Sequence, residues 1–299
     1  KEEHIMNDNQ LITVAGITYS KPTVILLQET GIGTAEYAAR TAYDSFGKSE
    51  NGAVHSLDFL ISEDNKQPKH VFTNTINTIN SIEHSNLLDD LAWTYFHHSV
   101  LEHASLTYLI KGTSRGVLQE LVRHRVASPT VRSTRYTMSS VINAFIASQY
   151  AEDNIEFFIS KILEFNMFVV QGSAEILEAS QLYYKLEHQL NVLSKAEFYK
   201  LAIAKSSLED NLWLFTPNEI DVFNMLQAGK AKRNIGDAFK WCVTDNFKTD
   251  LVFTINLRSL KNLLTLRDSG AAYFLIRELA QAMKVATPSK YLDLIIKAK

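Results

Sequence analysis

Residues 104–122 read ASLTYLIKGTSRGVLQELV and place a strand and a helix in direct succession. Apolar and polar residues alternate over 104–111, which predicts a strand with one buried face. From Val117 onward the apolar residues recur at helical spacing, so a helix is expected to follow at once. Thr113 or Ser114 is well placed to cap that helix.

Upstream of this pair, β-branched runs predict strands, and Ala-rich or amphipathic stretches predict helices. Strands are expected at Leu11–Ile17 and Thr23–Leu27, a helix capped by Thr34 at 34–46, a loop at 47–70 and a second helix at 74–97. Gly31-Ile32-Gly33 indicates a tight strand-to-helix turn, because a dinucleotide-binding loop would need a third glycine. Trp93, Tyr95 and Phe96 are expected to lie in the core.

Downstream, a strand is expected to begin near Ser133, another spans Leu251–Ile255, and two helices follow, the second over 271–283. Residues 151 to about 230 repeat apolar positions at helical spacing and are predicted to be all-helical. Few strands among many helices indicate the α+β class, with a central mixed or antiparallel sheet, flanking helices and a long helical insertion. We expect one domain over residues 1–299, with the helical elaboration at about 151–230.

The composition sets bounds on the class of protein. The chain has 299 residues, of which 46% are apolar, enough to bury a large core. The net charge of −3 gives no overall attraction to nucleic acid or to an anionic membrane, so any polyanion site must be local. No apolar run is long enough to span a bilayer. Cys242 is the only cysteine, which leaves no intramolecular disulfide and favours a reducing, cytoplasmic location.

The densest polar cluster is the stretch RHRVASPTVRSTRY at residues 123–136. It holds four arginines directly after a helix, and arginine presents a planar fork of donors that matches phosphate oxygens. Pro129 ends the helical pattern and favours an extended turn. On composition alone, a solvated basic turn or a nucleic-acid patch explains the cluster equally well.

The order of residues in this cluster resembles the signature of the flavin-dependent thymidylate synthases. The signature is carried by Arg123-His124-Arg125 and, after seven residues, by Ser133-Thr134-Arg135-Tyr136. Other segments resemble the same family, namely HHSVLEH at 97–103, SRGVLQEL at 114–121, NLRSLKNLLTLR at 256–267 and IRELA at 276–280. Residues 151–230 carry no part of the resemblance.

The resemblance implies an FAD enzyme that methylates dUMP to dTMP, with methylenetetrahydrofolate as carbon donor and NADPH as reductant. It also implies a homotetramer with active sites between subunits. FAD would be bound by His97, Ser99, Arg123, His124, Arg125, Val131, Asn256, Leu257, Arg258 and Asn262. The substrate dUMP would be bound by Glu120, Leu121, Val122, Arg123, Val131, Arg132, Ser133, Thr134, Arg135, Lys240 and Arg267. Arg267 would be catalytic by stabilising negative charge on the uracil, since a guanidinium does not lose its proton.

The chemistry implied by the resemblance suits what the chain contains. A reduced flavin delivers hydride without an enzyme thiolate, and Cys242, flanked by bulky residues, fits a buried structural role. No metal is expected, because the histidines at 97, 98 and 103 have only Glu102 as an acidic neighbour at ligand spacing. Two alternatives remain open: a flavin- or nucleotide-binding paralogue without methyl transfer, and a nucleic-acid-binding protein, which the net negative charge disfavours.

Three positions depart from the family pattern. Val131 stands where an acidic or polar residue is common, Val243-Thr244 replaces a Leu-Pro turn, and Ala272-Tyr273 replaces an Ala-Gln pair. The first two departures change residues at which the family pattern implies one contact with the flavin and one contact with the nucleotide.

Overall fold

The computed structural model of the chain describes residues 11–14, 17–52, 54, 77–134, 148, 152–162, 168–169, 184, 245 and 247–297. The chain forms two compact units. The first, which we call the sheet unit, comprises Pro22–Lys111, Gln119–Thr130 and Leu251–Lys299. The second, the hairpin unit, comprises Lys1–Lys21, Gly112–Leu118 and Val131–Asp250.

A four-stranded sheet with the strand order β3-β4-β7-β5 is the centre of the α+β fold. Its strands are β3 (Thr23–Glu29), β4 (Ser105–Ser114), β5 (Ala127–Val131) and β7 (Lys248–Asn256). β3 runs antiparallel to β4. The strands predicted at 104–111, 23–27 and 251–255 are therefore confirmed, and each extends further than the sequence pattern indicates.

No strand begins at Ser133 or Thr134, and residues 135–147, where the expected strand would continue, lie outside the described residues. The strand that the structure describes is β5, which ends at Val131. Pro129 lies inside β5, although proline has no N–H to donate to a neighbouring strand. β5 is an edge strand of the sheet, and an edge is where a sheet tolerates proline. The sequence pattern misses the strand because it takes proline as a break.

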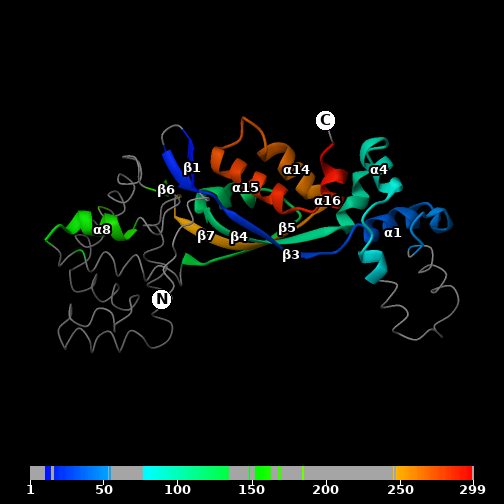
Figure 1. The fold of residues 1–299 in the computed structure, drawn as a ribbon, viewed down its shortest axis with the longest axis horizontal. Coiled ribbons are helices and arrows are strands. Elements are labelled where there is room, and N and C mark those ends of the chain that lie inside the picture. The colour runs from blue at the N-terminus through cyan, green and yellow to red at the C-terminus, as the bar shows by residue number, and fades with distance from the viewer. Residues whose placement is uncertain are drawn as a thin grey trace, which may run out of the picture. The chain divides into compact units, whose positions relative to one another are not determined.

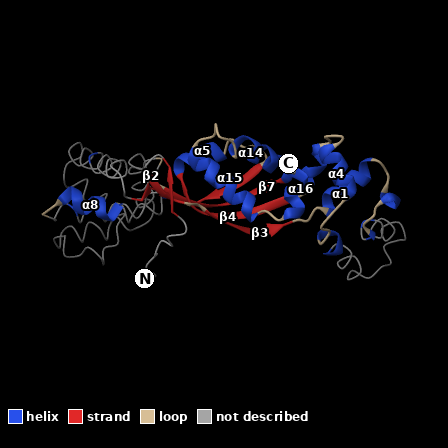
Figure 2. Cartoon of the chain, turned by 45° about the horizontal axis from the view of Figure 1, so that its top comes forward, coloured by secondary structure: helices blue, strands red, loops and turns tan. Residues whose placement is uncertain are grey.

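Three helices lie on one side of the sheet, as Figure 1 shows: α14 (Leu257–Arg267), α15 (Phe274–Ala286) and α16 (Ser289–Ile295). Figure 2 shows the same arrangement of helices over strands. The hydroxyl of Tyr108, which is fully buried on β4, lies 2.7 Å from the hydroxyl of Thr287 at the end of α15. The first two helices were predicted and are confirmed. The third, which begins after Pro288, was not predicted.

The turn between β3 and α1 (Gly33–Ala42) needs both of its glycines. Gly31 has a φ of 76°, in the left-handed region that glycine adopts without steric penalty. A Cβ on Gly33 would lie 2.1 Å from the carbonyl oxygen of Ile79. The predicted strand-to-helix turn is confirmed. The predicted cap is wrong, because Thr34 lies inside the first turn of α1 and not before it.

The continuous helix expected at 74–97 is divided into shorter pieces. Residues 77–80 are helical, and α4 (Asn86–Trp93) begins only after Ser85, whose hydroxyl accepts a hydrogen bond from the first turn. A 3-10 helix, η3 (His98–His103), follows α4. A capping serine starts a new helix, and the apolar pattern alone does not reveal that break.

The loop expected at 47–70 begins with a short 3-10 helix, η2 (Phe46–Lys48). The predicted helix at 34–46 ends at Ala42, because Asp44 has a φ of 46° that no helix continues through. Residues 55–70 lie outside the described residues.

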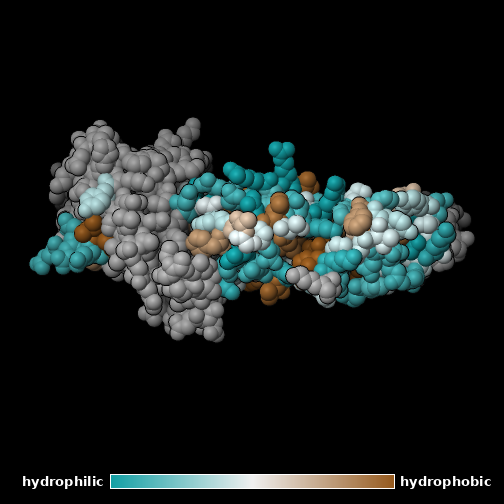
Figure 3. Space-filling model, turned by 90° about the horizontal axis from the view of Figure 1, so that it is seen from above, coloured by the Kyte–Doolittle hydropathy of each residue, from teal (hydrophilic) through white to brown (hydrophobic). Residues whose placement is uncertain are grey.

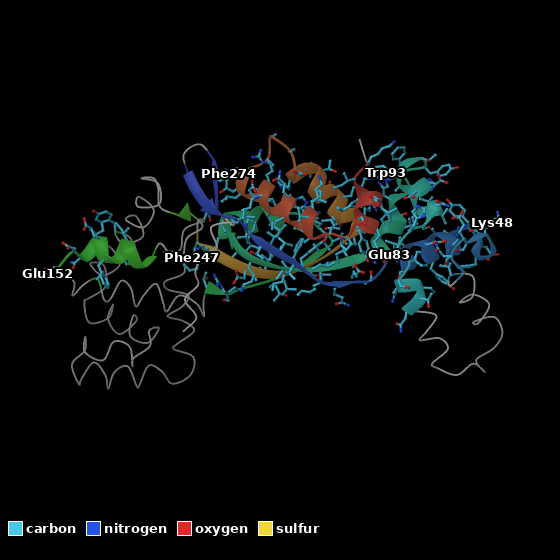
Figure 4. The ribbon with its side chains drawn as sticks, viewed as in Figure 1. Lys48, Glu83, Trp93, Glu152, Phe247 and Phe274 are labelled. Carbon is cyan, nitrogen blue, oxygen red and sulfur yellow. The ribbon has the colours of Figure 1, made fainter. Side chains whose placement is uncertain are left out.

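Only one of the three aromatic residues expected in the core packs partly inside. Trp93, labelled in Figure 4, donates its indole N–H to the carbonyl oxygen of Asp293 on α16, at 2.8 Å. Tyr95 and Phe96 are 60% and 64% exposed, so the expectation is wrong for both. They follow the end of α4, where a φ of 56° at Phe96 turns the chain toward η3.

The hairpin unit contains a sheet with the order β1-β2-β6, formed by β1 (Leu11–Val14), β2 (Ile17–Ser20) and β6 (Phe168–Val169). The single strand expected at 11–17 is therefore wrong. Val14 pairs with Ile17, so the run folds back on itself as a hairpin.

Part of the predicted helical segment at 151–230 falls within the described residues. α8 (Asn154–Ile162) is helical as expected, whereas β6 is a strand, so the segment is not helical throughout. Apart from Tyr184, residues 170–230 lie outside the described residues.

Candidate active site

Glu120 brings together arginines from two distant segments. It lies at the end of α5 (Arg115–Leu121), the helix predicted to follow β4. Its carboxylate oxygens lie 3.0 Å from Nη2 of Arg267 and 3.5 Å from Nη1 of Arg123. Arg123 comes two residues after the end of α5, whereas Arg267 is the last residue of α14. Three residues expected to bind dUMP are therefore in contact.

His124 joins this cluster from the buried side. Its Nε2 accepts a hydrogen bond from Nε of Arg267 at 3.0 Å, and only the neutral imidazole can accept it. Burial, and then the positive charge of Arg267, lower the pKa of His124 from its ordinary value of 6.5, while Glu120 opposes this shift. Geometry and electrostatics both favour the neutral ring, so Arg267 is held by two acceptors.

The start of α14 supplies a second group of predicted residues. The Asn256 side chain caps the helix by accepting from the backbone N–H of Ser259 at 2.8 Å. Arg258 is exposed and forms an ion pair with Glu102 of η3. Asn262, one turn further along, is also exposed, as the predicted i, i+4 relation requires. The Ser259 hydroxyl donates to the carbonyl oxygen of Arg125 at 3.2 Å. That bond joins the start of α14 to the turn Arg123–Val126, which we call the RHR turn.

The RHR turn itself holds an unusual backbone conformation. Val126 has a φ of 59°, which is disfavoured for a β-branched residue. The side chain is 70% exposed. Such conformations cluster at ligand sites, where the surrounding structure maintains them. The turn presents Arg123 and Arg125 to solvent just before β5 begins.

The donor set around the RHR turn fits a dinucleotide with two phosphates. Arg123, Arg125 and Arg258 are all exposed, and guanidinium forks bind phosphate oxygens bidentately. The N-terminus of α14 adds the positive end of a helix dipole beside Arg125. These residues of the sheet unit therefore suit FAD, the cofactor that the family resemblance implies.

The residues after β5 belong to the hairpin unit. Arg132 forms an ion pair with Asp250 at 3.1 Å, and Thr134 is buried. Val131 is half-buried and Ser133 is exposed. Arg135, Lys240, Cys242 and the Val243-Thr244 departure lie outside the described residues.

The remaining predicted residues differ in how their side chains are placed. Leu121 and Leu257 are fully buried, so their side chains belong to the core, and Val122 is 50% exposed. His97 and Ser99 are both exposed at η3. Nδ1 of His97 lies 3.4 Å from the hydroxyl of Tyr43.

Two residues that hold segments of the predicted site were not themselves predicted. Ser259 holds the RHR turn, and Asp250 holds Arg132. Asp250 carries one signal in the sequence, since an acidic residue at the start of an apolar strand needs a partner. Ser259 carries no such signal in the sequence, apart from its place in the first turn of a predicted helix.

Within the described ranges, no helix is long and apolar enough to cross a membrane. The same ranges contain no group of three histidine, cysteine or acidic side chains placed to hold a metal ion.

Comparison with protein families gives one match over most of the chain. Residues 25–288 match the family described as thymidylate synthase complementing protein. Among single proteins, the flavin-dependent thymidylate synthase of Wolinella succinogenes is 28% identical over 269 residues, which are 90% of this chain and 95% of that protein. The flavin-dependent thymidylate synthase of Campylobacter jejuni is 28% identical over 269 residues, 90% of this chain and 93% of that one.

Solved structures give the same result. Thymidylate synthase X from Helicobacter pylori, crystallised with FAD and dUMP, is similar with a TM-score of 0.55 and 26% identity. The match covers 92% of this chain and 97% of that one.

Proposed function

The chain belongs to the family of flavin-dependent thymidylate synthases, and from that membership we propose that it methylates dUMP to dTMP. Methylenetetrahydrofolate is the proposed carbon donor, and NADPH the proposed source of electrons for FAD. The observation that carries the proposal is the cluster of Glu120, Arg123, His124 and Arg267, which combines the family signature with the end of α14.

In this proposal, FAD lies against the RHR turn and the start of α14. Arg123, Arg125 and Arg258 bind its phosphates, and His124, Asn256 and Asn262 complete the site. His97 and Ser99 contact the cofactor from η3, and Val131 and the Leu257 backbone lie at its edge. Bound FAD supplies the hydride that turns a transferred methylene into a methyl group.

The substrate dUMP is proposed to lie beside Glu120 and Arg267. Ser133, Thr134, Arg135 and Lys240 bind its polar groups, and Leu121 and Val122 contribute through the end of α5. Arg267 stabilises the negative charge that develops on the uracil as the ring becomes nucleophilic. Glu120 and His124 hold the Arg267 fork in one orientation, so little reorganisation is needed when that charge appears.

The proposed reaction needs no covalent enzyme nucleophile. Cys242 is the only thiol in the chain, and its neighbours include no histidine that would activate it. The charge-stabilising role falls instead to the guanidinium of Arg267.

We propose that the enzyme acts as a homotetramer. The outer face of the main sheet, opposite α14 and α15, supports this assembly. Ile25 is 47% exposed and pairs with Leu109, and Leu27 is 53% exposed at a bulge in β3. The helical side differs, since its described surface is mostly hydrophilic with scattered apolar patches (Figure 3). Exposed aliphatic side chains on a sheet face are typical of a surface that an assembly covers.

The test is the visible absorption spectrum of the purified, FAD-loaded protein before and after addition of NADPH, dUMP and methylenetetrahydrofolate. We expect the flavin band to bleach with NADPH, and dTMP to form only when all substrates are present. A protein that binds flavin and dUMP but forms no dTMP would be the paralogue without methyl transfer. A protein that takes up no flavin would refute the proposal.

A further inference from the structure

The carboxylate of Asp250, near the start of β7, accepts hydrogen bonds from β4 and from the residue that follows β5. Its Oδ2 accepts from Nη1 of Arg132 at 3.1 Å, just beyond the end of β5. Its Oδ1 accepts from the backbone N–H of Gly112 in β4 at 2.8 Å. Gly112 has a φ of 70°, a conformation that favours glycine. One carboxylate therefore ties β4 to the segment that follows β5.

Arg132 makes three hydrogen bonds to β7. Its backbone N–H donates to the carbonyl oxygen of Asp250 at 2.8 Å. Its Nη2 donates to the carbonyl oxygen of Lys248 at 2.7 Å, while Nη1 donates to the Asp250 carboxylate. Both terminal nitrogens thus point along β7. The guanidinium therefore already has partners on β7 for both of its terminal nitrogens.

The Arg132–Asp250 pair contacts two segments that lead into the residues proposed to bind dUMP. Ser133 is the next residue after Arg132, and Thr134 and Arg135 follow it. On the β4 side, Gly112 comes two residues before Ser114, whose hydroxyl caps α5 by accepting from Val117 at 3.1 Å. The start of α5 is also bound to the residues around the start of β7. The backbone N–H groups of Arg115 and Gly116 donate to the carbonyl oxygens of Phe247 and Asp245.

We infer that Arg132 and Asp250 are positioning residues, which fix the backbone of Ser133 and Thr134 for dUMP and do not contact the nucleotide. This inference rests on the proposed function and replaces a direct contact between Arg132 and dUMP. Both side chains are partly exposed, at 39% and 29%, so the ion pair alone is a weak source of stability. The pair matters because it orients the residues that follow Arg132, and small displacements of such binding groups lower the affinity for the nucleotide.

The test is a double-variant cycle in the full-length, FAD-loaded enzyme. Arg132→Gln, Asp250→Asn and the double variant are compared with the wild type by the KM for dUMP, kcat and FAD content. We expect each single variant to raise the KM for dUMP about tenfold, with kcat changed less than about twofold and FAD content unchanged. The double variant is expected to be no worse than either single variant, because both break one interaction.

Two further variants keep the test sound. Arg132→Lys retains the charge and one donor, so it should recover part of the affinity that Arg132→Gln loses. Asp89→Asn breaks another exposed pair, with His84 at 2.9 Å, and should leave the KM for dUMP unchanged. If one of the Gln or Asn variants loses its flavin, the Lys variant still reports on the pair through its KM for dUMP.

Failure of this inference can be told apart from failure of the proposed function. An effect of Arg132→Gln on the KM with none from Asp250→Asn would overturn the inference and show direct binding by Arg132. Penalties that multiply in the double variant would also overturn it, because the two residues would then act independently. Failure of the wild type to form dTMP would instead refute the proposed function itself.

Discussion

At the scale of single residues, the distinctive feature is an arginine whose orientation is set before any ligand arrives. Arg267 donates through Nε to His124 and pairs through Nη2 with Glu120. Electrostatic stabilisation is most effective when the stabilising group does not have to reorganise during the reaction. In the proposed mechanism, the geometry and the charge of this one side chain are therefore both functional.

Arg267→Lys tests the geometry while it keeps the positive charge. A lysine ammonium cannot satisfy His124 and Glu120 and present a planar fork together, so we expect kcat for dTMP formation to fall by about 100-fold or more. FAD content is expected to stay normal, since the role lies on the uracil. Lys48→Ala, an exposed cation labelled in Figure 4, is the control and should leave both values unchanged. Near-normal turnover of Arg267→Lys would remove the fork from the mechanism.

The lowered pKa of His124 predicts a pH dependence of stability. In the unfolded chain the ring binds a proton near its ordinary pKa of 6.5, whereas the folded protein resists protonation down to lower pH. The contribution of His124 to stability is therefore fully present above that pKa and is lost as the pH falls below it.

Chemical unfolding of the wild type and His124→Gln at several pH values measures this effect. The difference in free energy of unfolding between the two proteins should be constant above about pH 6.5 and shrink as the pH is lowered. Glutamine removes the titrating group and keeps a polar side chain. A difference that stays constant at every pH would contradict a neutral, buried His124.

At the scale of elements, the sequence predicts what depends on local pattern. Alternation is enough to find β4 and β7, and helical spacing is enough to find α14 and α15. Prediction from local pattern fails at β5, where proline is accepted only because the strand lies at the edge of the sheet. It also fails at α16, because that helix is shorter than the sequence window in which a helical period can be recognised.

The candidate site follows the same rule. A motif supplies the residue types, so Glu120, Arg123 and Arg267 can be selected from the sequence. Their partners depend on tertiary pairing across more than a hundred residues, so neither the His124–Arg267 bond nor the Arg132–Asp250 pair was predicted.

The turn into α1 is an element whose sequence requirement can be measured. A Cβ on Gly33 would lie 2.1 Å from a backbone oxygen of Ile79, which cannot move aside as a flexible side chain would. We expect Gly33→Ala to lower the free energy of unfolding by about 3 kcal/mol, in the range of severe packing changes. Gly47→Ala is the matched control, because a Cβ there meets nothing within 4 Å. Equal thermal stability of the two variants would show that the turn adjusts.

At the scale of the whole molecule, the two sides of the main sheet differ in what they expose. α14, α15 and α16 cover one side, and Tyr108 and Phe253 are fully buried there. On the other side Thr107 and Thr254 share a face, with their hydroxyl oxygens 3.0 Å apart, and Ile25 lies opposite Leu109. A half-buried band of threonine and aliphatic residues is suited to contact with another protein surface.

Ile25→Glu tests whether this face holds the proposed tetramer together. A carboxylate in the centre of an apolar interface would be desolvated without a partner, so assembly should weaken strongly. We expect size-exclusion chromatography with light scattering to show the mass of four chains for the wild type and a smaller species for the variant. Since Ile25 is already 47% exposed in the single chain, circular dichroism should show that the variant still folds.

Val285→Glu places the same charge on the helical side, where Val285 is 88% exposed, and should leave the tetramer intact. If the active site is built between subunits, dTMP formation will be lost together with the tetramer in Ile25→Glu and kept in Val285→Glu. A variant at Ile25 that is dissociated but fully active would place the complete site within one chain. A variant that remains tetrameric would mean that the assembly uses a different surface, because an unpaired carboxylate at the interface is not accommodated without cost.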